Sequence, residues 1–395
     1  MNALPPRNST LRRKVVLPLC VILLTTEAAL ALPNTRPMSA YGVNGEVRSI
    51  VQVGSKVWVA GRFTQIVANT RSSSPEDSDV EVNLAAFSLN GTPLDIEPDL
   101  GGRDSIVYDL ALAPDGITVY AAGRFRAHGA ENLFAFDGVT GAKIRSYATP
   151  LVYAVHDDGA RLWAGGRHLL EIVSPVRVRT VVTAATDDER PPQVFDITSA
   201  PRGGVFIACR CDSLDGASAS AFARVRRDGV LVKSWNPSRL DTASVGRKVL
   251  AADGVTYLAA GGSDFVQAVR SWSGRSIWKT DANGQVQATT VLGHHLVIGG
   301  HWRVVQSYCQ PRLAALDLAT GTLERSWTPA PNPGYAGVWA LAATSDGALW
   351  AGGQFSRLGI DWLRNGLACV YTNGDQTRPR AAAPNPWARG IARLR

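Results

Sequence analysis

The sequence predicts an all-β protein, a seven-bladed β-propeller of four-stranded antiparallel blades. Three observations predict it: one short phrase recurs seven times, the copies lie about 49 residues apart on average, and glycine-bearing turns separate the apolar runs between them. A repeat of this length, built from strands, is typical of propeller blades. The chain has 395 residues, of which 45% are hydrophobic and 19% charged, so it has enough apolar side chains for a large core.

The recurring phrase is an apolar run that ends in a small residue, as in residues 57–61. We expect the small residue to let neighbouring backbones approach near the axis of the ring. An aromatic residue often precedes it, and we expect that side chain to pack between blades. The small-residue column is Gly61, Gly123, Gly166, Cys209, Gly261, Gly300 and Gly353, and the aromatic residues are Trp58, Tyr120, Trp163, Phe206 and Trp350.

Each copy is interpreted as the second strand of a four-stranded unit. An alternating run such as residues 47–50 precedes it, and a run such as residues 312–316 follows as the third strand. A tight turn such as Asn90-Gly91, whose residues readily adopt positive φ, leads to a fourth strand such as residues 323–327. We expect residues 40–43 to pair as the outermost strand of the seventh blade.

The two ends of the chain differ from the repeats. Residues 1–31 predict a secretory signal peptide, with a basic start, a short apolar run and the cleavage site Ala29-Leu30-Ala31. An uncleaved anchor is the alternative, but the apolar run is short for a membrane span. We assign residues 32–379 to the propeller and residues 380–395 to an exposed tail rich in Arg, Pro and Ala. This organisation predicts a secreted, extracellular monomer with no membrane span after cleavage.

Composition excludes some classes of function. The leader and the tail carry much of the formal net charge of +8, so we predict no nucleic-acid partner. The sequence contains no zinc-site spacing, phosphate loop, dinucleotide fingerprint or nucleophile elbow. It therefore predicts no metal and no cofactor, and it identifies no catalytic residue. The acidic insertion at residues 76–81 is interpreted as a solvated loop rather than a calcium site, because it contains no glycine for the sharp turn.

Four cysteines remain after cleavage of the leader. Cys209 and Cys211 lie two residues apart, and we expect buried thiols there because a ring closed over one residue is strained. A metal or redox pair is the alternative interpretation. A disulfide between Cys309 and Cys369, which belong to neighbouring blades, is left open.

The repeat pattern resembles a known family. Residues 338–341, 346–347 and 352–355 give valine-x-alanine-leucine, aspartate-glycine and glycine-glycine-x-phenylalanine in order, and residues 234–237 give the aromatic-asparagine-proline end. This pattern is similar to the bacterial extracellular propeller repeats of the delta-sixty type, over roughly residues 40 to 380. The resemblance implies an extracellular propeller. That family has no settled activity, so the resemblance implies no site residues.

The strongest candidate for a binding site is the end of the channel where the second strands finish. The residue after the small-residue column is a cation in five copies, and converging guanidinium groups suit an anionic ligand. The alternative, which we favour, is that each arginine pairs with an acid of the next blade or packs its stem on an aromatic ring. The column reads Arg62, Arg124, Arg167, Arg210, Gly262, His301 and Gln354.

A second column begins the inner strands with Tyr108, Tyr153, Phe195 and Trp339. Aromatic rings there could stack on a sugar, or they could belong to the core between blades, which we favour. Asp109 and Asp196 come one residue later; they could bridge to the arginines, bind water, or act as acid and base. His168 also lies near the same end and is, with His301, a minor catalytic candidate.

Three functions remain after these exclusions. The leading prediction is a non-enzymatic binding module for an anionic glycan, a cell-wall polymer or a protein partner. The second is a lyase or glycoside hydrolase whose residues come from several blades. The third is a structural protein whose basic tail clings to an anionic cell surface.

Overall fold

The protein is described here by a computed structural model. It describes residues 32–33, 41–69, 82–96, 98, 100, 102, 104–219, 221–235, 237, 245–331, 337–358, 362–363 and 366–371. The predicted signal peptide, the acidic insertion at residues 76–81 and the predicted tail lie outside these residues. Within them, all regular secondary structure is β-strand, and no helix is long and apolar enough to cross a membrane.

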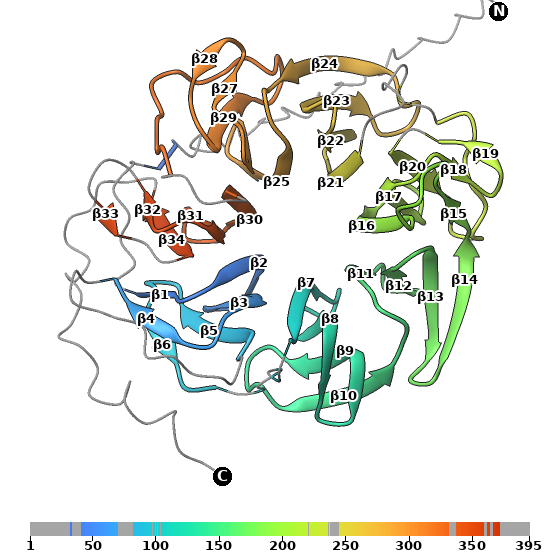
Figure 1. Ribbon diagram of the computed structural model, residues 1–395, viewed down its shortest axis with the longest axis horizontal. Coiled ribbons are helices and arrows are strands. Elements are labelled where there is room, and N and C mark those ends of the chain that lie inside the picture. Colours follow the sequence, from blue (N-terminus) through green and yellow to red (C-terminus); the bar gives the residue numbers. More distant parts are fainter. Residues whose placement is uncertain are drawn as a thin grey trace, which may run out of the picture.

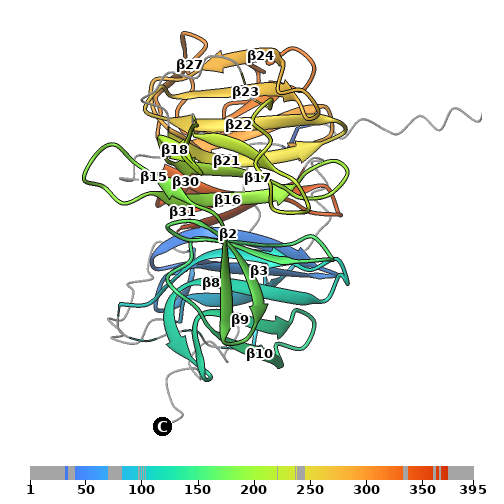
Figure 2. The same cartoon turned by 90° about the vertical axis from the view of Figure 1, so that its right-hand side faces the viewer.

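Most strands form antiparallel sheets that surround a common centre (Figure 1, and from the side in Figure 2). Within the described residues, four of these sheets have four strands. They are β2 (Glu46–Val53), β3 (Lys56–Arg62), β5 (Leu84–Ser88) and β6 (Pro93–Leu94); β7 (Ile106–Leu112), β8 (Thr118–Ala127), β9 (Ala130–Asp137) and β10 (Lys143–Ala148); β11 (Ala154–Asp157), β12 (Leu162–Gly165), β13 (Leu169–Ser174) and β14 (Arg177–Val182); and β21 (Val245–Ala252), β22 (Val255–Gly261), β23 (Phe265–Arg270) and β24 (Ser276–Asp281).

Three further sheets of the ring have three strands each in the described residues, and their first strands also face the centre. They are β16 (Gln193–Ser199), β17 (Val205–Arg210) and β20 (Phe222–Val225); β25 (Val286–Leu292), β26 (His295–Gly300) and β29 (Leu313–Asp317); and β30 (Gly337–Ala343), β31 (Ala348–Gln354) and β34 (Leu367–Tyr371). The inner strands β2, β7, β11, β16, β21, β25 and β30 each lie against the next, and β30 lies against β2.

Small sheets extend the loops outside the ring, and one of them overturns a prediction. β1 (Tyr41–Val43) pairs with β4 (Ile66–Ala68), not with the last sheet, so the expected outermost strand of the seventh blade is wrong. Asn44 gives the reason, because its side-chain oxygen accepts the backbone N–H groups of Thr64 at 2.9 Å and Gln65 at 3.0 Å. The other small sheets are β15 (Ala184–Ala185), β18 (Ser213–Leu214) and β19 (Ala217–Ser218); β27 (Val304–Val305) and β28 (Tyr308–Cys309); and β32 (Arg357–Leu358) and β33 (Trp362–Leu363).

The aromatic column packs between sheets, as predicted. Trp58, Trp163, Phe206 and Trp350 are fully buried, whereas Tyr120 is half-buried. The indole N–H of Trp58 donates a hydrogen bond of 2.8 Å to a backbone oxygen of the next sheet. These side chains remove large apolar areas from water and join one sheet to the next.

The expected close approach between sheets occurs at Gly261, where a Cβ atom would lie 2.7 Å from the side chain of Gln285 before the next inner strand, but other positions of the glycine column have a different reason. A Cβ atom on Gly61 would lie 2.0 Å from the carbonyl oxygen of Glu46, and one on Gly353 would lie 2.0 Å from that of Gly337. Both oxygens belong to the inner strand of the same sheet, so the close approach is within a sheet rather than between neighbours. It occurs where the inner strand has a β-bulge, a distortion that commonly requires a small residue opposite.

The centre of the ring admits water. Each inner strand has another inner strand on either side, which would bury its residues if the centre were filled. Most residues of β2, β21 and β30 are nevertheless only partly buried. We call this space the central channel.

Candidate functional site

The second strands end where the inner strands begin, at one end of the channel that we call the mouth. Strand pairing places Arg62 opposite Glu46, the first residue of β2, and Arg210 opposite Gln193, the first residue of β16. The predicted arginines therefore share one end of the ring. We call the set of residues after the glycine column the rim column: Arg62, Arg124, Arg167, Arg210, Gly262, His301 and Gln354.

Three rim arginines contact loops that lead into inner strands: Arg62 contacts the loop of the next sheet, whereas Arg124 and Arg210 contact the loop of their own sheet. Arg62 Nη2 lies 3.9 Å from the carboxylate of Asp104, and Arg124 Nε donates to the backbone oxygen of the same residue at 3.1 Å. Arg210 donates to the carbonyl of Pro191 from Nε at 3.2 Å and from Nη2 at 2.7 Å. Pairing with an acid of the next blade, the interpretation that we favoured, thus holds for Arg62. Because the side chains of Arg62 and Asp104 are largely exposed to solvent, this ion pair stabilises the two charges only weakly.

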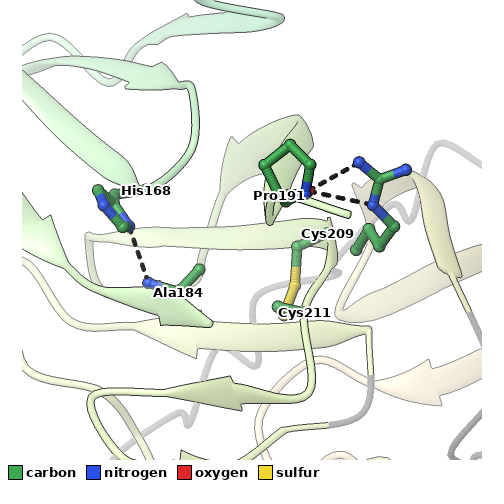
Figure 3. Close-up of a disulfide and its surroundings, with 6 residues drawn as sticks. His168, Ala184, Pro191, Cys209 and Cys211 are labelled. Atoms are coloured by element: carbon green, nitrogen blue, oxygen red, sulfur yellow. Dashed lines mark hydrogen bonds between the residues drawn. A yellow bond between two sulfur atoms is a disulfide. The ribbon is translucent and has the colours of Figure 1, made fainter. Parts of the chain in front are cut away.

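The two histidines near the mouth differ in their contacts. His168 Nδ1 accepts a hydrogen bond of 3.1 Å from the backbone N–H of Ala184 (Figure 3). His301 Nδ1 is buried and has no hydrogen-bond partner within the described residues. Burial lowers the pKa of His301; Asp264 opposes this effect, and Arg247 adds to it. The lowered pKa favours the uncharged form of the His301 imidazole.

A second set of side chains lies one step deeper, and we call it the inner column. In six inner strands the register shifts by one residue near the start of the strand, which is the mark of a β-bulge. The bulged residue, and Tyr153 at the corresponding place before β11, is partly exposed in every sheet. The inner column is Arg48, Tyr108, Tyr153, Phe195, Arg247, Gln287 and Trp339.

Ring contacts connect much of the inner column. The ring centroid of Tyr153 lies 5.1 Å from that of Tyr108 and 6.2 Å from that of Phe195. The guanidinium carbon of Arg247 lies 4.9 Å from the centroid of Phe195. None of the four aromatic residues predicted here belongs to the buried core, so the interpretation as core between blades is wrong for this column. Their partial exposure results from the bulges, which turn these residues out of the alternation along the strand.

The arginine on the other side of the column is also stacked. The guanidinium carbon of Arg48 lies 3.2 Å from the ring centroid of Trp339, and its Nη2 lies 2.8 Å from the carboxylate of Glu46. Burial lowers the pKa of Arg48, and Glu46 opposes that effect. Within the described residues, four polar atoms of the inner column are buried without a hydrogen-bond partner: Arg48 Nε, Arg247 Nε, Gln287 Oε1 and Trp339 Nε1.

A polar layer lies directly below the inner column. Asp196 accepts the Lys248 ammonium at 2.6 Å and the backbone N–H of Val249, in the next sheet, at 2.7 Å. Asp196 is only 5% exposed, whereas Lys248 keeps 35% of its side chain exposed to the channel. Burial opposes the charge of Lys248, but attraction by Asp196 and Asp109 is stronger and raises its pKa.

Asp109 occupies the equivalent place two sheets earlier. It accepts hydrogen bonds from Ser49 Oγ at 3.1 Å and from the backbone N–H of Val155, in the next sheet, at 3.0 Å. Burial raises the pKa of Asp109 to about 6; Lys248 opposes the shift and Asp196 adds to it. Neither aspartate bridges to the rim arginines, so that alternative is wrong. Both carboxylates instead connect successive inner strands.

Sequence reasoning missed Arg48, Arg247 and Lys248. Aligning the inner strands on the residue before the bulge, such as Val47 and Val338, places both arginines in the same column as the predicted aromatic rings. The predicted column was defined by aromatic residue type alone, which leaves out the arginines of β2 and β21. The positions of Arg48 and Arg247 in the repeat therefore indicated that they belong to the column, although their residue type did not.

The structure also corrects the prediction for the cysteines. Cys209 and Cys211 form a disulfide next to the mouth (Figure 3). β17 ends at Arg210, so the backbone is no longer a straight strand at Cys211, and the Cα atoms lie 5.5 Å apart, within the usual range for a disulfide. Cys309 is exposed and Cys369 is buried, and no disulfide joins them.

The mouth contains no group of three or more metal-ligating side chains in the part of the chain that the structure describes. Its cations and partly exposed aromatic rings are suited to binding an anion by charge-assisted hydrogen bonds.

Comparison with known proteins shows the fold. No protein-family model and no curated protein matches the chain. Among solved structures, the WD40 β-propeller domain of Doa1 is 12% identical with a TM-score of 0.55, covering 89% of this chain and 99% of that one. U3-55K is 14% identical with a TM-score of 0.57, covering 86% and 99%. The extracellular domain of BT4673 from B. thetaiotaomicron is 11% identical with a TM-score of 0.51, covering 87% of this chain and 41% of that one.

These likenesses establish an all-β propeller fold and nothing about activity. The predicted membership of the delta-sixty type of repeat stays a prediction, because no family model supports it.

Proposed function

We propose that the chain is an exported seven-bladed β-propeller that acts as a non-enzymatic binding module, with its ligand site at the channel mouth. The seven sheets of the ring correspond to the seven copies of the repeat, and the contact of β30 with β2 supports a closed ring. The predicted signal peptide supports export.

The observation that carries the binding function is the combination of cations and aromatic rings at one end of the channel. Arg62, Arg124 and Arg167 are exposed at the mouth, so their guanidinium groups are accessible to a ligand. A polyanion would replace the weak contact of Arg62 with Asp104 by several simultaneous charge-assisted bonds. We therefore propose an anionic glycan or cell-wall polymer as the ligand.

The test is binding of the purified chain from Leu32 to an array of glycans and cell-wall polymers at low and moderate salt. The variant Arg62→Ala/Arg124→Ala/Arg167→Ala should lose binding to the anionic polymers. The matched control removes three exposed arginines at or near the turns after the third strands, Arg177→Ala/Arg270→Ala/Arg275→Ala, and should bind as the unmodified protein does. Equal loss in both variants would indicate a general charge effect and would contradict the proposed site.

A second candidate function is a lyase or glycoside hydrolase, and one observation favours it. Burial raises the pKa of Asp109 to about 6, which is a value suited to a general acid. However, both carboxylate oxygens of Asp109 are occupied by Ser49 and Val155. Incubation of each bound polymer with the protein, followed by chromatography of the products, would detect cleavage. Cleavage that is abolished by Asp109→Asn would establish the enzyme.

A further inference from the structure

Arg247 has a cationic group that the fold holds in place but does not neutralise. Its guanidinium stacks at 4.9 Å on Phe195, and its Nε is buried without a hydrogen-bond partner within the described residues. No ion pair joins Arg247 to an acid in that part of the chain. Removing a charge from water without a partner is costly, so the arrangement favours an incoming anion.

Arg48 and Arg247 belong to the inner strands β2 and β21, which are on opposite sides of the centre (Figure 1). Both are the bulged residues of their strands and members of the inner column. Burial, together with the charges of Arg210 and Arg48, lowers the pKa of Arg247 to about 10. Arg48 already pairs with Glu46 at 2.8 Å, so an anion held between the two guanidinium groups would chiefly compensate the charge of Arg247.

We infer that Arg247 and Arg48 bind, between them on the channel axis, the carboxylate or phosphate of a single acidic sugar unit. This inference rests on the proposed function and specifies its ligand. Guanidinium groups form paired hydrogen bonds with carboxylate and phosphate oxygens, and stacking on Phe195 and Trp339 keeps both guanidinium planes in place. Tyr108 and Tyr153, which are partly exposed beside them, offer ring faces to the sugar.

The site takes the end unit of a glycan, or a free sugar acid, rather than a unit inside a chain. The inner column surrounds the axis on all sides, because one residue comes from each of the seven inner strands. Lys248 and Asp196 lie beneath it, and the rim arginines lie above it. A polymer that lies across the rim cannot place an internal unit in the column, whereas a chain end can enter along the axis.

The experiment measures binding of small acids by calorimetry and by shifts of the melting temperature. The probes are D-galacturonate, D-glucuronate and glucose 6-phosphate, with neutral D-glucose as the uncharged reference. We expect at least one acid to bind and glucose not to bind. Arg247→Gln should weaken that binding by about 10- to 100-fold, the loss expected for one charge-assisted pair. The control Arg270→Gln removes an exposed charge at the end of β23, away from the mouth, and should change the affinity less than threefold.

A second variant keeps the test valid if Arg247→Gln destabilises the fold. Arg247→Lys retains the charge but not the paired hydrogen bonds, and it should give an intermediate affinity with the melting temperature of the unmodified protein. Unchanged affinity in both variants would overturn the inference.

Failure of this inference differs from failure of the proposed function. Polymer binding that depends on Arg62, Arg124 and Arg167, with no binding or competition by any small acid, would refute the end-unit site and leave the rim as a polymer site. Binding of a small acid through Arg247 without any polymer binding would support the inference and refute the polymer ligand.

Discussion

The guanidinium of Arg48 lies over the indole of Trp339, with 3.2 Å between the guanidinium carbon and the ring centroid. The two residues belong to the first and last sheets of the ring, so this contact joins the two ends of the repeat. Gln52 makes a second connection between the same sheets, because its Nε2 donates to Ser345 Oγ at 2.7 Å and its Oε1 accepts the Ser345 N–H at 2.8 Å. In the part of the chain that the structure describes, side chains make these connections.

Trp339→Ala should therefore lower the free energy of unfolding by about 1–3 kcal/mol, because it removes a cation–π contact and apolar packing at the closure. The measurement is equilibrium unfolding in urea. Trp272→Ala is the matched control: Trp272 also contacts two arginines, Arg202 at 4.0 Å and Arg224 at 4.8 Å, but it is 56% exposed and lies away from the closure. It should cost less than about 1 kcal/mol. Equal losses in the two variants would argue against a special role for the closure.

The ion pair in the polar layer should be strongly coupled. Lys248→Met leaves Asp196 buried without its counter-ion and should cost about 1–3 kcal/mol, allowing for the partial exposure of Lys248. Asp196→Asn/Lys248→Met should cost less than the sum of the single variants, which a double-mutant cycle measures.

The control for that cycle is a surface pair of the same type. Lys279 and Asp281 lie 3.2 Å apart with 43% and 75% of their side chains exposed, so Lys279→Met should cost less than about 1 kcal/mol. Additive effects of the Asp196 and Lys248 substitutions would show that the buried pair is not coupled.

The sequence was sufficient to predict the all-β propeller, because recurring apolar runs, glycine turns and small residues each indicate the same repeat. It could not predict the pairing of β1. That pairing depends on one side chain, Asn44, whose oxygen accepts hydrogen bonds from the backbone N–H groups of Thr64 and Gln65. It could not predict the Cys209–Cys211 disulfide either, since the end of β17 at Arg210 decides whether the two side chains can meet.

The candidate site was predicted in part for a related reason. The column of Tyr108, Tyr153, Phe195 and Trp339 could be identified from spacing, and so could the rim arginines. A strict alternation along the strand places every second side chain on the same face, but a bulge breaks that alternation at one residue in six of the inner strands. Arg48 and Arg247 therefore became visible as partners of the aromatic rings only in three dimensions.

Asp109 should make the stability depend on pH in the direction opposite to most acids of this protein. Because its pKa is raised from 3.8 to about 6 in the folded state, the folded chain binds an extra proton between these values, and stability from this group falls as pH rises through that window.

Asp109→Asn removes the titration but keeps an oxygen to accept the Val155 N–H. The difference in unfolding free energy, unmodified protein minus variant, should thus decrease by about 1–3 kcal/mol between pH 4 and pH 7. Acids with lowered pKa values, such as Asp115 and Asp317, act in the opposite direction but are common to both proteins, so they cancel in the difference. Urea unfolding of both proteins at half-unit pH steps gives this difference. A constant value would show that folding does not shift the pKa of Asp109, and a rising value would show that the fold stabilises its carboxylate; either result would contradict the prediction.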